Sequence, residues 1–447
     1  MKIIISGAFA IGKHLARLLS RNHEDITLID SDSDRLSKVG MDYDLLTLEG
    51  HPGSIATLRE AGAEEADLYI SVTPDEALNL NSCILAHALG TTKTVAKIDN
   101  PEYVKPENQE FFEQLGVNSL IYPEMLAAVD INNGLKMSWV RQRWDVHNGA
   151  LVMLGIKLRE TCTILDKPLK EISGPDDPYH IVAIKRHDET IIPGGNDALK
   201  LYDLAYFMTT KEYIPYIRKI VGKEHYVDVK NVMVMGGGRT AVRAINTMPE
   251  YLNVKVIEID NDRCEKLNDL INGDKALVIN GDGRDIQLLI DEGIRNTQAF
   301  VALTASAETN ILACLTAKRL GVRKTVAMVE NIDYATMAES LDIGTVINKK
   351  VIAASHIYQM MLDADVFNVR FLTSANADVA EFVAKAGSKV TQHLVKDLGL
   401  PAGVTIGGLV REEKGMLVSG NTQILPGDTV VIFCHNINMK KIEKFFN

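Results

Sequence analysis

The sequence has few cysteines and no long apolar run. Its five cysteines, at positions 83, 162, 264, 314 and 434, are scattered and show neither C-x-x-C pairs nor the histidine spacing typical of zinc sites. No stretch reaches the roughly 18 consecutive apolar residues that a transmembrane helix needs, and no charged leader with a cleavage site precedes the first apolar stretch. We therefore expect reduced thiols and a soluble, cytoplasmic protein.

Basic charge is also scarce. The 447 residues include 48 lysines and arginines against 59 aspartates and glutamates, a formal net charge of −11. A broad basic face for nucleic acid or anionic lipid would have to form against this negative field. The sequence also shows no helix-turn-helix pattern, so neither nucleic-acid binding nor a transcriptional redox sensor is expected.

The most informative stretch is NVMVMGGGRTA, at residues 231–241. Its apolar run predicts a buried parallel strand, and the three glycines from Gly236 to Gly238 allow a tight turn with close backbone approach. A helix should begin near Arg239, with its free N–H groups facing a pyrophosphate. The next apolar run ends in Glu258, 20 residues after Gly238, which is the spacing at which a carboxylate meets an adenosine ribose.

The chain contains this unit twice. Near its beginning, KIIISGAFAIG spans residues 2–12, and Gly7 corresponds to Gly236 at an offset of 229 residues. The stretch SVTPDEALNLNSC at 71–83 likewise matches ALTASAETNILAC at 302–314. A period near half the chain indicates duplication of a two-domain unit.

Each copy alternates short apolar runs with amphipathic stretches. This pattern predicts an α/β fold with two Rossmann-like, doubly wound parallel sheets, each followed by a small β-rich α+β lobe. The first sheet should use strands near 2–6, 25–29, 44–48, 67–72, 93–98 and 118–122. Apolar helices at 124–140 and 349–361 are expected to connect the lobes or to pair subunits, and 419–434 (SGNTQILPGDTVVIFC) should form a hairpin.

The predicted boundaries divide the chain into lobes, connectors and a linker. N-lobe 1 and its connector helix span 1–122 and 123–148, and C-lobe 1 spans 149–208. A linker at 209–229 leads to N-lobe 2 at 230–347, a second connector at 348–365 and C-lobe 2 at 366–447.

Ligands of doubly wound sheets bind outside the carboxyl ends of the strands. In N-lobe 1 this rule places Gly7, Gly12, Asp30, Gly50 and Thr73 on one rim, beside His51. Because Asp30 and Glu258 are carboxylates, they favour a free ribose 2′-hydroxyl over a 2′-phosphate, so NADP should be disfavoured.

Taken together, these motifs resemble the TrkA family, the soluble nucleotide-binding subunits of Trk-type potassium uptake systems, and the resemblance covers essentially the whole chain. It implies two tandem RCK (or KTN) units that bind NAD(H), ATP or ADP. It also implies a homo-oligomer, typically a tetramer, at the inner face of the cell membrane. There the subunit would dock beneath a membrane potassium transporter, associate with the membrane only through that partner, and control its opening.

The resemblance also carries residue roles. In the second copy the matches to the family's phosphate, ribose and adenine-side contacts are Gly236, Gly238, Arg239, Glu258, Gly281, Asp282 and Thr304. In the first copy the matches are Gly7, Gly12, Asp30, Gly50 and Thr73. The first copy departs from the pattern at Phe9, where a side chain occupies the surface that a pyrophosphate would approach. We therefore expect the first site to bind nucleotide more weakly than the second.

Other interpretations concern catalysis, metal and aromatic residues. An NAD-dependent oxidoreductase is the alternative function, but no histidine stands at catalytic spacing and the C-lobes are small, so we expect no enzymatic activity. Asp30, Asp32 and Asp34 could hold a cation, although helix capping explains them more simply. Trp139 and Trp144 could stack on a base, and packing against another subunit is the preferred expectation.

Overall fold

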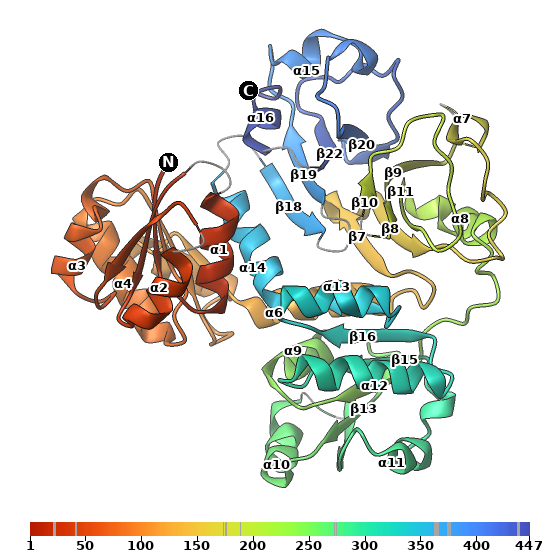
Figure 1. Ribbon diagram of the computed structural model, residues 1–447, viewed down its shortest axis with the longest axis horizontal. Helices are drawn as coiled ribbons and strands as arrows, with labels where there is room; N and C mark the ends of the chain where they lie inside the picture. Colours follow the sequence, from red (N-terminus) through yellow and green to blue (C-terminus); the bar gives the residue numbers. More distant parts are fainter. Residues whose placement is uncertain are drawn as a thin grey trace. The chain divides into compact units, whose positions relative to one another are not determined.

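The computed structural model describes residues 1–447 except 21–23, 41–42, 173, 175–176, 188, 272, 274, 362–365, 373–376 and 436–438. The chain forms two compact units, one of residues 1–126 with 349–361 and one of 127–348 with 362–447. The described residues contain two six-stranded parallel sheets and two five-stranded sheets (Figure 1). The predicted fold class is confirmed.

The sheet of N-lobe 1 has the strand order β3-β2-β1-β4-β5-β6, and every strand pairs in parallel with its neighbour. Its strands are β1 (Lys2–Ser6), β2 (Asp25–Asp30), β3 (Leu46–Glu49), β4 (Leu68–Ser71), β5 (Lys93–Lys97) and β6 (Ser119–Ile121). Its helices are α1 (Ala10–Ser20), α2 (Ser33–Gly40), α3 (Ile55–Glu60), α4 (Glu76–Leu89) and α5 (Pro106–Gln114). Strands β1 and β4 each carry three consecutive buried apolar or aromatic residues, at 3–5 and 68–70, as a parallel strand covered on both faces requires.

N-lobe 2 repeats this topology in the order β14-β13-β12-β15-β16-β17. Its strands are β12 (Asn231–Met235), β13 (Asn253–Glu258), β14 (Ala276–Asn280), β15 (Ala299–Ala302), β16 (Lys324–Met328) and β17 (Thr345–Ile347). Its helices are α9 (Arg239–Thr247), α10 (Asn261–Leu270), α11 (Ile286–Asp291), α12 (Ala307–Arg319) and α13 (Ile332–Ser340). Both sheets reverse their strand order beside the strand that leads into the glycine turn, which is where doubly wound sheets bind ligands.

The C-lobes are five-stranded antiparallel sheets with matching topology. The sheet of C-lobe 1 has the order β10-β9-β11-β8-β7, with β7 (Gln142–Val146) contributed by the first connector and with β8 (Leu151–Lys157), β9 (Tyr179–Arg186), β10 (Glu189–Ile191) and β11 (Leu204–Thr209). Helix α7 (Leu169–Ile172) lies in C-lobe 1, and α8 (Ile214–Ile220) lies in the linker that follows it. C-lobe 2 has the order β18-β19-β22-β20-β21, with β18 (Val366–Leu372), β19 (Ala377–Val383), β20 (Val404–Arg411), β21 (Lys414–Met416), β22 (Thr429–His435), α15 (Lys389–Gln392) and α16 (Met439–Glu443).

An ion pair between a partly exposed arginine and a buried aspartate recurs in both C-lobes. Arg186 clamps Asp203 with two hydrogen bonds of 3.0 and 2.8 Å, and Arg411 clamps Asp428 with two of 2.8 and 2.7 Å. Each arginine also donates to a backbone carbonyl of the loop that precedes its aspartate. A bidentate arginine thus fixes the same turn in each copy.

The prediction of a hairpin at 419–434 was wrong. Only its second half is a strand, and β22 pairs with β19 on one edge and β20 on the other. The preceding loop satisfies backbone N–H groups with side chains instead, since Ser419 donates to Thr422 Oγ1 at 2.9 Å and Leu425 donates to Asp428 Oδ2 at 2.8 Å. With both edges of β22 occupied, no edge remains for a hairpin partner.

The connector helices differ from the prediction in length and in packing. Helix α6 (Pro123–Leu135) ends before residue 140, and α14 (Lys349–Gln359) belongs to the same compact unit as N-lobe 1. Helix α14 packs against α1 and β6, as Figure 1 shows for α1. In the other unit, Asn132 of α6 donates to Ala244 O and Thr247 Oγ1 of α9, at 3.1 and 2.9 Å. Each copy therefore lends a connector helix to the N-lobe of the other copy.

The two tryptophans are core residues of the chain. Trp139 packs in the core of C-lobe 1, and Trp144 packs in a core that the sheets of both C-lobes share with Val182, Val379 and Phe433. Each indole is 6% exposed. The expectation that these side chains pack against another subunit was therefore wrong, because burial inside one chain already covers them.

Candidate nucleotide-binding sites

In N-lobe 2 the glycine turn follows β12 directly. Gly236 has φ +95°, a left-handed conformation that glycine adopts without strain, and its N–H donates to Ile257 O at 2.9 Å. A Cβ at Gly236 would lie about 3.1 Å from the backbone of Thr304, so the turn packs against the loop that follows β15. The turn itself therefore requires glycine at this position.

Gly238 plays a different part in the same turn. It precedes α9 as the N-cap residue with φ −70° and ψ 174°, values that any residue can adopt. A Cβ at Gly238 would meet no atom within 4 Å among the described residues. The Cβ position of Gly238 is therefore open space, and the next residue, Arg239, is exposed.

Glu258 is the last residue of β13, and its side chain accepts hydrogen bonds from the glycine turn and from the residues that follow β13. Its Oε2 accepts the Gly237 N–H at 2.6 Å, and its Oε1 accepts the Asp260 N–H at 3.0 Å. The residue is 5% exposed. The carboxylate that the spacing predicted is thus positioned by two backbone donors, and each of its oxygens keeps a further lone pair for a hydroxyl donor.

N-lobe 1 repeats this arrangement. Gly7 has φ +101°, and Asp30, which is 4% exposed, accepts the Ala8 N–H at 2.7 Å and the Asp32 N–H at 3.0 Å. Gly12 is required by packing, because a Cβ there would fall 1.9 Å from Gly7 O. The first copy therefore keeps the same hydrogen bonds between turn and carboxylate.

Phe9 marks the difference between the copies. The guanidinium of Arg35 lies 4.2 Å from the centroid of the Phe9 ring, and Arg35 also contacts Asp32 at 2.8 Å and Asp30 at 3.5 Å. The aromatic ring is thus held by a cation–π contact where Gly238 leaves open space in the second copy.

Two of the three aspartates of N-lobe 1, Asp30 and Asp32, accept hydrogen bonds from backbone N–H groups. Asp32 accepts the Arg35 N–H, and the pKa of Asp32 is lowered, chiefly by that backbone hydrogen bond. Among the described residues, no group of three or more histidines, cysteines or acidic residues is placed to hold a metal ion.

A third strand end completes each rim. Gly50 N donates to Asp30 O at 3.0 Å, and Gly281 N donates to Glu258 O at 2.9 Å. His51, which follows Gly50, accepts the Gly53 N–H at its Nδ1. Asp282, at the matching position, forms a fork with Arg284 whose shortest contact is 2.7 Å.

The Asp282–Arg284 pair changes the electrostatics of the second rim. Hydrogen bonding from the side chain of Arg284 lowers the pKa of Asp282 and raises that of the arginine. Arg284 was not predicted from the sequence. Together with Arg239 it gives the second rim two arginines, where the first rim has Gly53 and Ala10.

Two buried asparagines position the fourth strand end, and sequence reasoning missed both. Asn310 Oδ1 accepts from the Thr304 N–H at 3.0 Å and from its hydroxyl at 2.7 Å, and Asn310 Nδ2 donates to the carbonyls of Thr304 and Met328. Asn79 makes the same four hydrogen bonds around Thr73. Both asparagines are 0% exposed. Their signal was present in the repeat, because asparagine stands six residues after the threonine in each copy.

The structure thus brings the predicted residues together at two rims. In N-lobe 2, Gly236, Glu258, Gly281 and Thr304 lie at the carboxyl ends of β12 to β15. In N-lobe 1 the corresponding strand ends carry Gly7, Asp30, Gly50 and Thr73.

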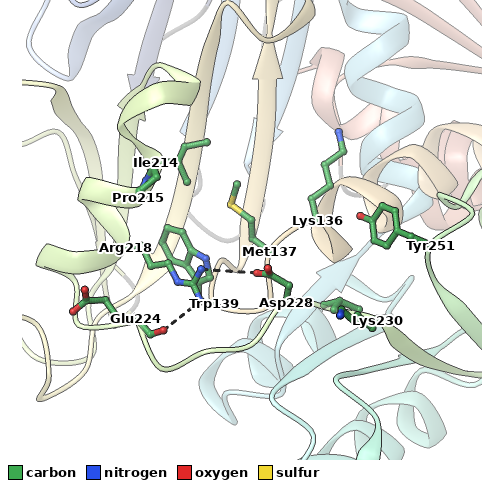
Figure 2. A pocket seen from close by; sticks show the side chains of 11 residues that line it. Lys136, Met137, Trp139, Ile214, Pro215, Arg218, Glu224, Asp228, Lys230 and Tyr251 are labelled. Atoms are coloured by element: carbon green, nitrogen blue, oxygen red, sulfur yellow. Dashed lines mark hydrogen bonds and ion pairs between the residues drawn. The ribbon is translucent and has the colours of Figure 1, made fainter.

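A separate cavity of about 720 Å³ lies away from these rims (Figure 2). It is lined by residues of the first connector, α8 and the linker, together with Tyr251, and by none of the predicted site residues. Arg218 spans part of it, contacting Asp228 at 3.8 Å and Glu224 O at 3.4 Å. Lys230 and Tyr251 stand just before β12 and β13, so the cavity adjoins the amino ends of the strands.

No helix of the described residues is long and apolar enough to cross a membrane.

Two matched Rossmann rims, each with its own antiparallel C-lobe, define a duplicated protein of the Rossmann-lobe and β-lobe class. The TrkA-N domain family matches residues 3–123 and 232–349, and the TrkA-C domain family matches residues 379–447. The chain belongs to the TrkA family, as the resemblance implied.

Relatives match over the full length of the chain. It is 30% identical to the Trk system potassium uptake protein TrkA of Haemophilus influenzae over 456 residues, covering 100% of this chain and 98% of the relative. It is also 30% identical to the protein of the same name from Vibrio alginolyticus, covering 98% and 96%. A TrkA homolog of Archaeoglobus fulgidus is 27% identical and is covered completely, as is this chain.

Solved structures share the fold. The GsuK RCK domain superposes with a TM-score of 0.59 at 15% identity, covering 99% of this chain and 94% of the other. The GsuK channel bound to NAD superposes with a TM-score of 0.60, also at 15% identity, covering 99% of this chain and 78% of the other. At this identity the likeness extends to the fold alone.

Proposed function

We propose that the chain is a cytosolic, nucleotide-binding regulatory subunit that gates a Trk-type membrane potassium transporter. The observation that carries the proposal is a pair of Rossmann rims in a chain of the TrkA family, whose full-length relatives are named as Trk system potassium uptake proteins. The subunit reaches the inner face of the membrane through the transporter and acts there as an oligomer, in our proposal a tetramer.

The second rim takes NAD(H), ATP or ADP in this proposal. The open space over Gly238 admits phosphates to the first N–H groups of α9, and Arg239 supplies a cation beside them. Glu258 accepts the ribose hydroxyls, while Gly281, Asp282 and Thr304 border the adenine side. An RCK-containing channel of similar fold is bound to NAD, which supports this choice of ligand.

The first rim binds the same nucleotides weakly. Its turn, Asp30, Gly50, His51 and Thr73 repeat the second rim, but Phe9 and Arg35 occupy the place of the open space. This difference in affinity suits regulation, because the second rim can bind nucleotide at concentrations at which the first rim stays empty.

Gating requires that nucleotide binds two conformations of the assembly with different affinity. Shifting a conformational ratio from about 1:99 to 99:1 needs roughly a 10⁴-fold difference, which several sites of an oligomer can supply together. Binding without turnover is enough for this role, and we infer no catalytic step.

Potassium flux tests the proposal. The chain is reconstituted with its Trk-type membrane partner in vesicles, and flux is measured with and without NADH, NAD⁺, ATP and ADP. We expect at least one nucleotide to change the flux and Gly238→Asp to abolish that response, because its carboxylate repels phosphate. Gly195→Asp is the matched control and should respond like the unaltered chain, because Gly195 is exposed on a loop of C-lobe 1 and a Cβ there would make an ordinary contact of 3.4 Å with Lys170 Cβ. Flux that ignores every nucleotide would contradict the proposal.

The oxidoreductase alternative is tested separately. NADH is incubated with the chain and a panel of small carbonyl compounds. Sustained oxidation at about ten per second, the usual enzyme scale, would favour the alternative.

A further inference from the structure

In the compact unit of residues 127–348 and 362–447, one carboxylate is shared by three cations. Asp342 lies in the turn after α13, where it adopts φ +56°. Arg141 donates to its Oδ1 and Arg159 to its Oδ2, while Lys318 Nζ lies 3.2 Å from Oδ2 and also donates to the Asp342 carbonyl. A single negative charge cannot balance three positive ones.

Two further lysines are buried near these cations, and burial lowers the pKa of each. Lys324 and Lys223 are each 3% exposed. Lys324 Nζ donates to Val140 O at 2.6 Å and to Thr345 Oγ1 at 3.0 Å, and Lys223 Nζ lies 3.4 Å from the Tyr226 hydroxyl. In the part of the chain that the structure describes, neither lysine forms an ion pair with a carboxylate. A buried charge without a counter-charge is costly.

The cations lie close enough to repel one another. Burial and the charge of Arg159 both lower the pKa of Arg141, although Asp342 opposes them. Burial and the charge of Arg141 likewise lower the pKa of Lys318. Glu339, at the end of α13, also opposes the lowering of the Arg141 pKa by its negative charge. In a protein of net charge −11, this excess of positive charge is local and needs its own explanation.

The cluster lies at the edge of the sheet opposite the nucleotide rim. Lys324 and Thr345 are the first residues of β16 and β17, whereas the rim follows the last residues of β12 to β15. Arg141 and Arg159 come from the first connector and C-lobe 1, and Lys318 comes from N-lobe 2. Whatever binds here therefore bridges the two lobes.

We propose that this cluster is an anion site for a small multivalent oxyanion of the phosphate class, bound by Arg141, Arg159 and Lys318 in competition with Asp342. Guanidinium forks match the geometry of phosphate oxygens. The side chains of Arg159 and Asp342 are each 32% exposed, so an anion reaches them from solvent. Binding draws C-lobe 1 and N-lobe 2 together, since each contributes cations.

Calorimetry with inorganic pyrophosphate on the full-length chain tests this site, with chloride used to hold ionic strength constant. We expect a binding phase that Arg159→Gln weakens by about tenfold or more, as loss of one charge-assisted contact does. Arg59→Gln is the matched control, since it removes an exposed arginine of α3 that belongs neither to the cluster nor to a nucleotide rim, and it should leave this phase unchanged. Absence of binding, binding that Arg159→Gln leaves unchanged, or an equal loss in both variants would overturn the proposal.

Asp342→Asn gives an independent reading with the opposite sign. An anion site should bind pyrophosphate more tightly once the competing carboxylate is gone, and the thermal midpoint of this variant should rise more with pyrophosphate than that of the unaltered chain. A purely structural salt-bridge cluster would show no such gain, so an equal or smaller rise counts against the site. Because neither outcome involves nucleotide or potassium flux, the proposed gating function stands or falls separately.

Discussion

Gly236 and Gly238 lie two residues apart in the same turn and have different roles. Gly236 has φ +95° and packs on the loop of Thr304, so a side chain there would disturb the fold. Gly238 has φ −70° and open space around it, so a side chain there would disturb only a ligand. Substitution at Gly238 therefore separates binding from stability.

Replacing Gly238 with phenylalanine copies the residue of the first rim into the second. We expect an unchanged thermal midpoint and affinity for NADH and ATP reduced by roughly ten- to a hundredfold, because backbone contacts to phosphate worth about 1.5 to 3 kcal/mol are lost. Calorimetry measures both sites. Phe9→Gly is the reciprocal variant and should strengthen the first site. If Gly238→Phe keeps the tight phase and Phe9→Gly alters it, the sites are assigned the wrong way round.

Lys324 makes stability depend on pH. Burial, reinforced by the charge of Arg141, lowers its pKa to about 7 in the folded chain, against about 10.4 for an unfolded lysine. Between these values the unfolded chain binds more protons than the folded one, so Lys324 contributes a stability that rises with pH from about 7 to 10 and is flat below. Lys324→Met should remove this rise in urea unfolding, whereas Lys219→Met, an exposed lysine of α8, should keep it. An unchanged slope in Lys324→Met would refute the prediction.

At this scale the glycine and acid spacings predicted that these residues lie at the strand ends, since such spacings follow from the geometry of a strand, a turn and a helix. It did not predict Arg35, Arg284 or the buried asparagines. Their roles depend on which side chain faces which loop, and that is decided by tertiary packing. The repeat did mark Asn79 and Asn310 as a matched pair.

At the scale of elements, the loop after β15 depends on Asn310. Asn310→Ala removes four hydrogen bonds in a fully buried site, and unfolding free energy should fall by about 2 to 4 kcal/mol. Nucleotide affinity should fall too, because Thr304 loses its support. Urea unfolding and calorimetry measure the two effects. Asn108→Ala, which loses one exposed hydrogen bond, is the control, and equal losses in both variants would show that the loop does not need Asn310.

Two element predictions failed for reasons that lie outside local sequence. The proline, glycine and aspartate at 426–428 do form a turn, yet β19 and β20 already fill both edges of β22, so no hairpin can form. Helix α6 stops at Leu135 because Trp139 and Val140 are needed in the core of C-lobe 1. In both cases packing elsewhere overrides the local pattern.

At the scale of the molecule, most apolar residues of the connector helices are buried within the chain, although Val129 of α6 is 48% exposed, so we look to other surfaces for the proposed oligomer. Helix α12 and the end of α13 expose Leu312, Met337 and Leu341 at 64%, 47% and 47%. We expect light scattering to give a mass above the 49.3 kDa monomer, and Leu312→Glu to lower it. Leu425→Glu, on a loop of C-lobe 2, should not. A monomer at micromolar concentration would contradict the expectation.

The duplication predicted four lobes, and the repeat supplied their order. The exchange of connector helices could not be predicted in the same way, because an exchanged and an unexchanged pair have the same sequence period. Only the packing of α14 on α1 and of Asn132 on α9 distinguishes them.

That exchange has a consequence for the history of the two halves. Separate proteins that trade helices come apart on dilution, but halves joined in one polypeptide stay at a high effective concentration however scarce the protein is. Each half can also accept mutations that its twin does not share. Gly238 in the second rim and Phe9 in the first differ at matched positions. A homodimer could never acquire such a difference, because both of its subunits have the same sequence.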